Sequence, residues 1–495
     1  MQPILRELKN LEDGICFKIG FEVIKVLRFF LITGVFDKPA RASFLNIISS
    51  NGYFGCLKCL QPGETINHVH VYKFKRNNPS GPLRNKETYD SDCQTSSNGI
   101  KGKIGLSDLR YFSPLYSTNI DYMHSVLEGV VKRFFKYWFD VPWSHSLKSF
   151  TLEIDKRLMR IKPPSFVPIT PRSIEQRNKW RANEYLDFLL YYCLPVFHGI
   201  MEPTYWTNLM KLVVSMEVLL DRKIKRNDLL VVRKILISFV KEAEEIYPPE
   251  IMVSGMHELL HLVDCTIEFG PLNCVNSFQF EELNRKILSL IHGKDLMGDE
   301  FMNLFSILQA LVFFSFKNTN KVLIEYFEKH NIIKSSNTKR LTTRNENLKP
   351  LGKTTIPSVR EKNFILSYYD ETNIDSFKLC YKFSFKGILY TSLSSDTKRC
   401  DYCIKTRDNN FYGLIEYFLY NESKVYVVCK KLVKLLAPFF DPENSEVKSK
   451  SILCNLTERQ FVTTIDKLVK VFFIKVSDNN NNAYISSFSI SHLFM

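Results

Sequence analysis

The sequence predicts a mixed α/β fold: an α/β N-terminal part, then an all-α segment, then a small β-domain. Three observations support this division. Residues 1–60 alternate short apolar runs with turn signals. From Asp121 onward, apolar residues recur at spacings of three and four, which is typical of helices. Between residues 363 and 475, short runs rich in Phe, Tyr, Val and Ile are typical of strands.

The composition limits the class of protein. The chain has 495 residues, of which 45% are hydrophobic and 24% charged. This is ordinary globular usage and excludes a disordered, collagen-like or mainly membrane-embedded protein. Lys and Arg number 67 against 52 Asp and Glu, which gives a net charge of +15. The excess favours a polyanionic partner, either nucleic acid or an anionic membrane surface, without choosing between them.

The N-terminal segment predicts neither a signal peptide nor a membrane span. Residues 1–13 carry several charges, unlike a signal peptide. The apolar stretch 21–36 is interrupted by Lys25 and Arg28 and is too short to cross a bilayer. We therefore expect the 12 cysteines to be thiols rather than disulfides.

The individual elements follow from local patterns. Residues 23–36 predict a buried strand that ends in a loop at Asp37. Residues 61–110 are poor in large apolar residues and predict a long, basic, mostly irregular segment. Residues 334–355 predict a polar linker. The stretches expected to be helical are 121–155, 185–194, 205–220, 228–246, 256–269, 278–292 and 300–316, with a proline-rich loop at 163–173.

A histidine pair is the first candidate for chemistry. His257, Glu258 and His261 match H-E-x-x-H, and two histidines one helical turn apart are a sound pair of metal ligands. In a zinc protease Glu258 would be the general base, and Glu281, 20 residues after His261, a third ligand. The alternative is an amphipathic helix with two partly buried histidines, because short motifs of this kind also match by chance.

A cysteine pair is the second candidate. Cys56 and Cys59 form a C-x-x-C, which is half of a tetrahedral zinc site. The residues alone leave two completions open: the histidine pair, or a second C-x-x-C formed by Cys400 and Cys403. The second C-x-x-C lies in a strand-like segment, which favours two buried structural thiols.

Three further residues are candidates by position. Asp37 ends an apolar run, and the carboxyl end of a strand is a common place for a metal-binding or catalytic carboxylate. The local alternative for Asp37 is a surface turn before Pro39. Asp121 and His124 form a D-x-x-H at the start of a helix, where Asp121 could be an N-cap.

The order of these motifs resembles the core of the CACTA-type (EnSpm, Tnp2-like) DNA transposases, over roughly residues 1–320. No single motif decides the resemblance, whereas several in the same order are specific. The resembling segments are residues 36–42, 51–63, 105–107, 121–124 with 127–130, 189–195, 257–262, and 270–272 leading to 278–281.

The resemblance implies a cut-and-paste transposase with an RNase H-like core that is interrupted by a helical insertion. Such cores use Asp, Asp and Glu to hold two Mg²⁺ or Mn²⁺ ions. The ions activate a water or a DNA 3′-hydroxyl and stabilise in-line displacement at phosphorus. Asp37 matches the second Asp and Glu281 the final Glu.

The resemblance also implies a structural zinc. Related transposases pair a C-x-x-C after the second Asp with two histidines before the Glu. In this sequence these ligands are Cys56, Cys59, His257 and His261. Glu258 then occupies a position that is usually apolar in the family, so its match to a protease motif would be accidental.

One part of the family pattern has no match. The first catalytic Asp of the family lies on an early strand, yet Asp13 is the only Asp before Asp37 and lies in a segment that resembles a turn. We therefore expect an incomplete, N-terminally truncated core without a DNA-binding domain ahead of it, catalytically inactive as this chain. The alternative is a non-catalytic, transposon-derived module that binds DNA or protein.

The expected organisation has five parts. Residues 1–60 are a partial RNase H-like core, 61–255 an insertion, 256–330 helices that return to the core, 331–360 a linker, and 361–495 a β-rich domain. The expected cofactors are structural Zn²⁺ and, in a catalytic chain, Mg²⁺ or Mn²⁺. The expected partner is DNA, both transposon ends and target, and a homo-oligomer is compatible with this expectation. We expect no membrane partner and a nuclear location.

Overall fold

The computed structural model describes residues 2–19, 23–293, 295–317, 322, 348–395, 398–435, 449–475 and 482–486. The protein is of mixed class, 44% helical and 21% strand, which confirms the predicted combination of helices and sheet. It divides into two compact units, Met1–Ser277 with Pro350–Met495, and Phe278–Lys349. None of the helices in these described ranges has both the length and the apolar character that crossing a bilayer requires.

The first unit begins with α1 (Gln2–Asp13) and an antiparallel hairpin of β1 (Ile15–Ile19) and β2 (Val23–Leu27). The prediction of one buried strand over 23–36 is wrong. After β2 the chain turns back onto α1, where Phe29 N donates to Leu11 O at 2.9 Å, and Phe29 itself is 50% exposed. A separate short strand, β3 (Gly34–Phe36), follows.

Strand β3 and β6 (Thr118–Ile120) form a parallel pair in which Phe36 lies opposite Ile120. Helix α2 (Lys38–Phe44) starts directly after β3, and Asp37 is its N-cap. Because the strands are parallel, their C-terminal ends lie at the same edge, which brings the residues after Phe36 and after Ile120 together.

The segment 61–110 is more ordered than its composition predicts. It contains the hairpin of β4 (Glu64–Ile66) and β5 (Val69–Val71), helix α3 (Lys86–Thr95) and a 3₁₀ turn, η1 (Gly105–Asp108). Single apolar residues, rather than runs, supply its core. The buried cluster that joins this segment to α1 and α2 contains Leu5, Leu45, Ile47, Leu57, Tyr89, Ile100, Ile104, Leu106, Leu109, Phe112 and Leu115.

The helical region confirms the helices predicted between 185 and 269, whereas the stretch predicted as helical over 121–155 is interrupted by a non-helical segment at 141–147. A continuous helix runs from Met123 to Asp140, with regular α4 (Lys132–Phe135) between two wider, π-helical segments, η2 (Met123–Val131) and η3 (Lys136–Asp140). The helices that follow are α5 (Thr151–Met159), α6 (Ala182–Asp187), η6 (Phe188–Tyr192), α7 (Cys193–Phe197), α8 (Pro203–Leu219), α9 (Arg226–Ile246), α10 (Ser254–Glu258), η8 (Leu259–His261) and α11 (Leu262–Phe269).

Aromatic packing holds these helices together. Trp138 stacks on Phe134 with ring centroids 5.3 Å apart, and its Nε1 donates to Tyr247 Oη at 3.1 Å. Phe239 of α9 meets Phe134 edge to face. Burial of such large rings is the main source of stability in a helical core.

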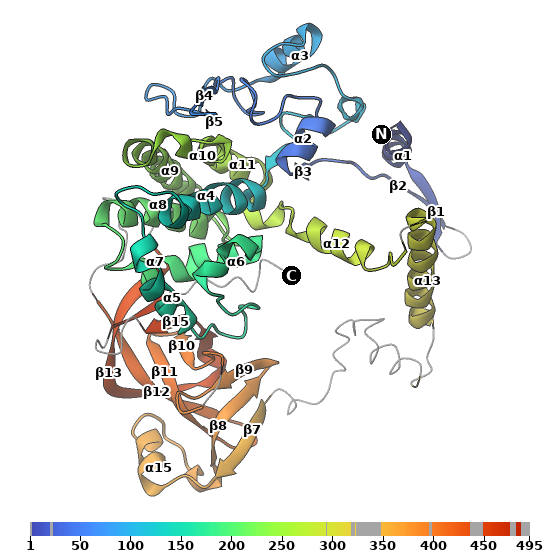
Figure 1. Ribbon diagram of the computed structural model, residues 1–495. Coiled ribbons are helices and arrows are strands. Elements are labelled where there is room, and N and C mark those ends of the chain that lie inside the picture. The colour runs from blue at the N-terminus through green and yellow to red at the C-terminus, as the bar shows by residue number, and fades with distance from the viewer. Residues whose placement is uncertain are drawn as a thin grey trace. The chain divides into compact units, whose positions relative to one another are not determined.

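The C-terminal strands form one curled, antiparallel, ten-stranded sheet, shown in orange to red in Figure 1. The strand order is β14-β10-β11-β12-β13-β16-β15, with β8 added on β11, and β7 and β9 on β8. The elements are β7 (Leu348–Thr355), α15 (Val359–Leu366), β8 (Lys378–Phe385), β9 (Ile388–Thr391), β10 (Cys403–Thr406), β11 (Tyr412–Tyr420), β12 (Val425–Lys434), β13 (Ser451–Thr464), β14 (Leu468–Lys470), β15 (Phe472–Lys475) and β16 (Asn482–Ser486).

The prediction of strands after residue 363 is thus confirmed, and the linker prediction needs a correction. Residues 334–347 lie outside the described residues. Residues 348–355 form strand β7, not a linker. Among the described strands β7 pairs with β8 alone, so it lies at the edge of the sheet, where mostly exposed polar residues are tolerated.

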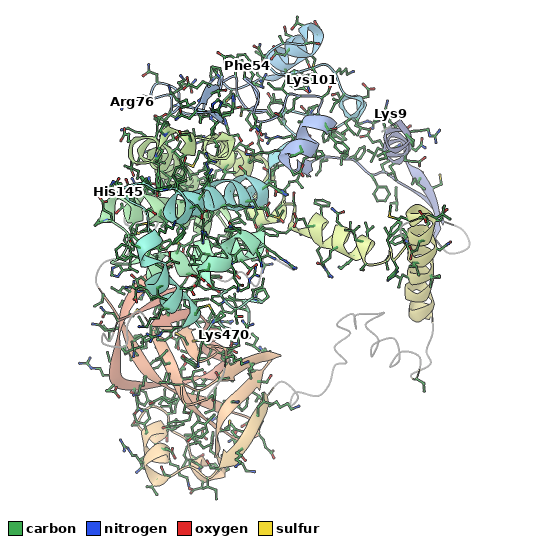
Figure 2. The ribbon with its side chains drawn as sticks, in the orientation of Figure 1. Lys9, Phe54, Arg76, Lys101, His145 and Lys470 are labelled. Carbon is green, nitrogen blue, oxygen red and sulfur yellow. The ribbon has the colours of Figure 1, made fainter. Side chains whose placement is uncertain are left out.

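Within the first unit the sheet packs directly on the helical region. Lys470 Nζ, labelled in Figure 2, lies 2.7 Å from Asp401 Oδ1 and 2.9 Å from Ser165 Oγ. Tyr191 of η6 stacks on Phe472 of β15 with ring centroids 4.6 Å apart. A hydrogen bond and an aromatic stack therefore connect the sheet to residues of the helical region that are about 300 positions away in the sequence.

The second unit, described by itself, contains α12 (Phe278–Leu288) and α13 (Met297–Lys317). Both confirm the helices predicted at 278–292 and 300–316. Glu281 lies in the first turns of α12 and is exposed.

Candidate metal centre

The loop that carries Cys56 and Cys59 is fixed by a buried arginine. The side chain of Arg84 is fully buried and pairs with Asp92 at 3.0 Å. Its Nε donates to Cys56 O at 3.2 Å, and its Nη2 donates to Asn98 O at 2.6 Å. The guanidinium therefore holds the backbone of the loop from behind the two thiols.

The position before Cys56 requires a glycine, Gly55, because there is no room for a side chain. A Cβ at this position would lie 2.5 Å from Ser49 O and 2.8 Å from Tyr72 Oη. The turn can close on the neighbouring segments only without a side chain. The backbone N–H of Gln61 donates to Cys59 Sγ at 3.4 Å and acts to lower the pKa of this thiol, but the hydrogen bond to Cys56 and burial outweigh it and raise the pKa.

The two histidines come from the helical segment formed by α10 and η8. His257 and His261 are one turn apart and 2% and 1% exposed. Their helix lies tight against the helix that begins at Met123, because a Cβ on Gly255 would be 2.8 Å from Ser125 O. This close contact sets the depth at which the imidazoles reach the cysteine loop.

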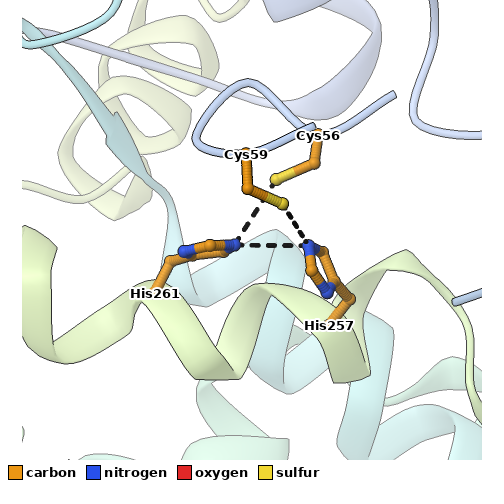
Figure 3. A group of neighbouring side chains, drawn as sticks. All are labelled: Cys56, Cys59, His257 and His261. Carbon is orange, nitrogen blue, oxygen red and sulfur yellow. Dashed lines mark hydrogen bonds between the residues drawn. The ribbon is translucent and has the colours of Figure 1, made fainter. Parts of the chain in front are cut away.

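The four side chains converge (Figure 3), with their ligand atoms all within 4.8 Å of one another. Cys56 Sγ is 3.6 Å from His261 Nε2, and Cys59 Sγ is 3.2 Å from His257 Nε2. The two Nε2 atoms are 3.2 Å apart. A tetrahedral zinc with usual bond lengths separates sulfur from nitrogen by about 3.6 Å and two nitrogens by about 3.3 Å. The buried group could therefore bind a metal ion such as zinc.

The chemistry of the donors fits a cation. Two Nε2 atoms this close cannot both carry a proton, whereas a shared cation would be stabilised by both lone pairs. A hydrogen bond from the Cys59 thiol, together with the neighbouring imidazoles, lowers the pKa of Cys56 well below its usual range despite burial. A thiolate is the form of cysteine that binds metals.

Tyr72 closes the group on one side. Its ring stacks on His257 at 4.9 Å between centroids. Its backbone N–H donates to Met252 O at 2.7 Å, and its hydroxyl to Ser50 O at 3.2 Å. Sequence reasoning missed both Tyr72 and Arg84. The only available signal was a large aromatic and an arginine in a segment otherwise predicted to be irregular.

Glu258, the central residue of H-E-x-x-H, is engaged in ion pairs. Arg41 Nη2 donates to Glu258 Oε1 at 2.6 Å, Lys38 Nζ is 3.2 Å from Oε2, and Ser125 Oγ donates to Oε2 at 2.6 Å. Burial acts to raise the pKa of Glu258, but the two cations outweigh it and lower the pKa to about 2. A general base works best with a pKa near the working pH, so these contacts favour a structural role.

Asp37 and Asp121 both follow the ends of the parallel strands. Asp37 Oδ1 accepts from Ala40 N at 2.6 Å as the N-cap of α2. Asp121 is 3% exposed, and its Oδ2 is 2.5 Å from His124 Nδ1. Its Oδ1 accepts from Ser277 N at 2.9 Å. Asp121 thus opens a helix, as expected, and also stands at the same sheet edge as Asp37, which the sequence did not predict.

The second C-x-x-C lies apart from the Cys2His2 group. Cys400 and Cys403 are buried in the core of the C-terminal sheet, and burial raises the pKa of Cys400 to about 12. Glu281 belongs to the second unit and Asp37 to the first, so their approach stays a prediction. Among the described residues, one cluster of His, Cys, Asp or Glu has metal-binding geometry, the Cys2His2 group.

Comparison of the chain with models of known protein families finds no match, and neither does comparison with curated protein sequences.

We predict one bound zinc per chain, lost on replacement of a ligand. Cys56→Ser and His261→Ala should each remove the metal and lower the melting temperature, because the metal joins two distant segments and its binding contributes directly to folding. Metal analysis of the purified protein and thermal unfolding with and without a chelator measure this. Cys16→Ser, at an exposed thiol, should keep the zinc. Full zinc content in both ligand variants would contradict the assignment.

We also predict that Glu258 can be changed without loss of the metal. Glu258→Gln leaves Arg41 and Lys38 without their counter-charge and should lower the free energy of unfolding by about 3–5 kcal/mol, while zinc stays at one per chain. Urea unfolding and metal analysis test both statements. Glu245→Gln, which removes an exposed pairing with Arg76, should cost less than about 1 kcal/mol. Unchanged stability together with lost peptidase activity would instead favour the protease interpretation.

Proposed function

We propose that the chain is part of a DNA transposase of the CACTA type. In this proposal it carries the second Asp and the final Glu of an Asp/Asp/Glu site on an RNase H-like core. The observation that carries the proposal is the Cys2His2 group. It joins a C-x-x-C that follows a strand-end Asp to two later histidines, in the order that the resemblance implies. His257 follows Cys59 by 198 residues, and His261 follows Cys56 by 205.

The surroundings of Asp37 support a role in metal binding. It stands at the carboxyl edge of the parallel strands, where phosphoryl-transfer carboxylates are commonly placed. Only its Oδ1 is used by the N-cap contact among the described residues, which leaves Oδ2 for a ligand. Asp37 and Glu281 would hold Mg²⁺ or Mn²⁺, hard cations that prefer carboxylate oxygens and that stabilise charge on a phosphoryl group.

The nearest cations take no part in binding DNA in this proposal. Lys38 and Arg41 flank Asp37, but both are committed to Glu258. Phosphate neutralisation has to come from other members of the +15 excess, which is large enough for a polyanionic partner. A transposase of this kind would act on nuclear DNA.

The alternative is a transposon-derived module that binds DNA without cleaving it. The observation that favours it is the incomplete set of catalytic carboxylates. The sequence matches two of the three positions, Asp37 and Glu281, and a module that only binds DNA needs none of them. The zinc protease is the weaker alternative. Its catalytic metal needs an open coordination position, whereas four side chains surround this site and Glu258 is held in ion pairs.

We predict that the chain binds DNA mainly through phosphate contacts. Affinity for a duplex should fall steeply between about 50 and 200 mM salt and depend weakly on sequence, because released counterions drive such binding. Fluorescence anisotropy with a labelled duplex over a salt series measures the slope. An affinity that does not change with salt would contradict a DNA partner and with it both the transposase and the DNA-binding alternative.

We further predict that this chain by itself does not cleave DNA. A two-metal site needs a carboxylate that bridges both ions, and Asp37 and Glu281 supply two of the three positions. The test is nicking and strand transfer on purified protein with Mg²⁺ or Mn²⁺. Cleavage that disappears in Asp37→Ala, with zinc content unchanged, would overturn the expectation of inactivity. It would point to Asp121, at the same sheet edge, as the third carboxylate.

A further inference from the structure

A hollow of about 630 Å³ lies where the helical region meets the C-terminal sheet. Its walls come from α5 and the residues after it, from α7, from the loop before β10, and from β15. All of these belong to the first unit. Neither the metal group nor Asp37 contributes to it. Pockets of 300–1,000 Å³ are the usual size for small ligands.

The charges around this hollow are strongly unequal. Five cationic side chains and one carboxylate, Glu153, line it. Arg157 pairs with Glu153 at 3.0 Å and also donates to Val196 O at 3.1 Å and His198 O at 2.7 Å, so it braces the wall and neutralises the carboxylate. The cations that remain are Lys156, Arg160, Lys162 and Lys475.

Three of these cations have no counter-charge. Within the described part of the chain, Lys156, Lys162 and Lys475 make no ion pair or hydrogen bond, and all three are exposed. Like charges gathered around a concave surface repel one another and raise the local positive potential. An anion that enters the hollow relieves that repulsion, and phosphate, with several acceptor oxygens, can bind several such donors at once.

Part of the lining of the hollow is apolar. Ile161, Val196 and Phe473 contribute carbon surface, and Phe473 lies near Tyr402 with ring centroids 6.2 Å apart. The Cys400 thiol also lines the hollow, and its raised pKa keeps it uncharged near pH 7. A ligand for this site therefore combines phosphate groups with an apolar or aromatic part.

We propose that this hollow binds a nucleotide-sized phosphate ester. The phosphates lie against Lys156, Lys162 and Lys475, and the base or another flat apolar group lies against Val196 and Phe473. The same chemistry comes from a free nucleotide or from one or two nucleotides at the end of a single DNA strand. A ligand held in this way bridges α5 and β15 and stabilises the contact between helices and sheet.

The experiment uses the zinc-loaded full chain and isothermal titration calorimetry with three probes: ATP, a four-nucleotide thymidine oligomer, and adenosine. The test variant is Lys156→Ala/Lys162→Ala/Lys475→Ala. The matched control is Lys223→Ala/Lys234→Ala/Lys241→Ala, three exposed lysines of the α8–α9 turn and α9 that lie outside the hollow. Circular dichroism and metal content show that both variants are folded.

We expect ATP or the oligomer to bind the unaltered chain with a dissociation constant below about 1 mM, and the test variant to bind at least about tenfold more weakly. Binding of ATP identifies a free nucleotide as a ligand, and binding of the oligomer alone identifies a DNA strand. The proposal is overturned if neither probe binds, if the control variant loses as much affinity as the test variant, or if adenosine binds as tightly as ATP.

Discussion

The Cys2His2 group is the constraint on which the rest of the N-terminal half depends. It holds together segments about 200 residues apart. Closing a loop of that length costs roughly 5 kcal/mol of chain entropy, whereas a structural zinc in such a site contributes about 10–16 kcal/mol. A single bound zinc would therefore outweigh the closure cost and allow the segment between its ligands to vary in length. The hairpin of β4 and β5, α3 and the helices from Met123 to Ile246 all lie inside this loop.

The metal group also determines where Asp37 stands. Glu258, between the two histidines, forms ion pairs with Lys38 and Arg41, and α2 follows Asp37 directly. The orientation of α2 is thereby coupled to the histidine helix. Buried ion pairs contribute little net stability but are costly to break, so they specify one arrangement in preference to others. A residue that resembles a protease base is better explained as the connection between the metal group and the carboxylate at the strand end.

The sequence predicts some of these features and not others for identifiable reasons. Helices such as α9 were predictable because apolar residues recur at helical spacing over many turns. The four residues of the Cys2His2 group were predictable as candidate ligands from residue type and spacing. Their pairing came from the resemblance, since Cys400 and Cys403 offered the same chemistry. The prediction of a single strand over 23–36 failed because hydropathy does not show the hydrogen bond from the Phe29 backbone N–H to Leu11 O of α1, which ends the strand. The roles of Arg84 and Tyr72 depend on contacts with distant segments, which no local pattern encodes.

Asp121 makes a contact that the sequence did not predict. Its Oδ1 binds the backbone of Ser277, and Asn119 Nδ2 donates to Val275 O at 3.1 Å, so β6 fixes the residues that immediately precede α12. Glu281 follows Ser277 by four positions in the sequence. The strand edge that presents Asp37 therefore also holds Val275 and Ser277, the last residues of this part of the first unit, in place. Asp121 is therefore a structural residue of this edge as well as the start of a helix, because both of its carboxylate oxygens are engaged, by Ser277 and by His124.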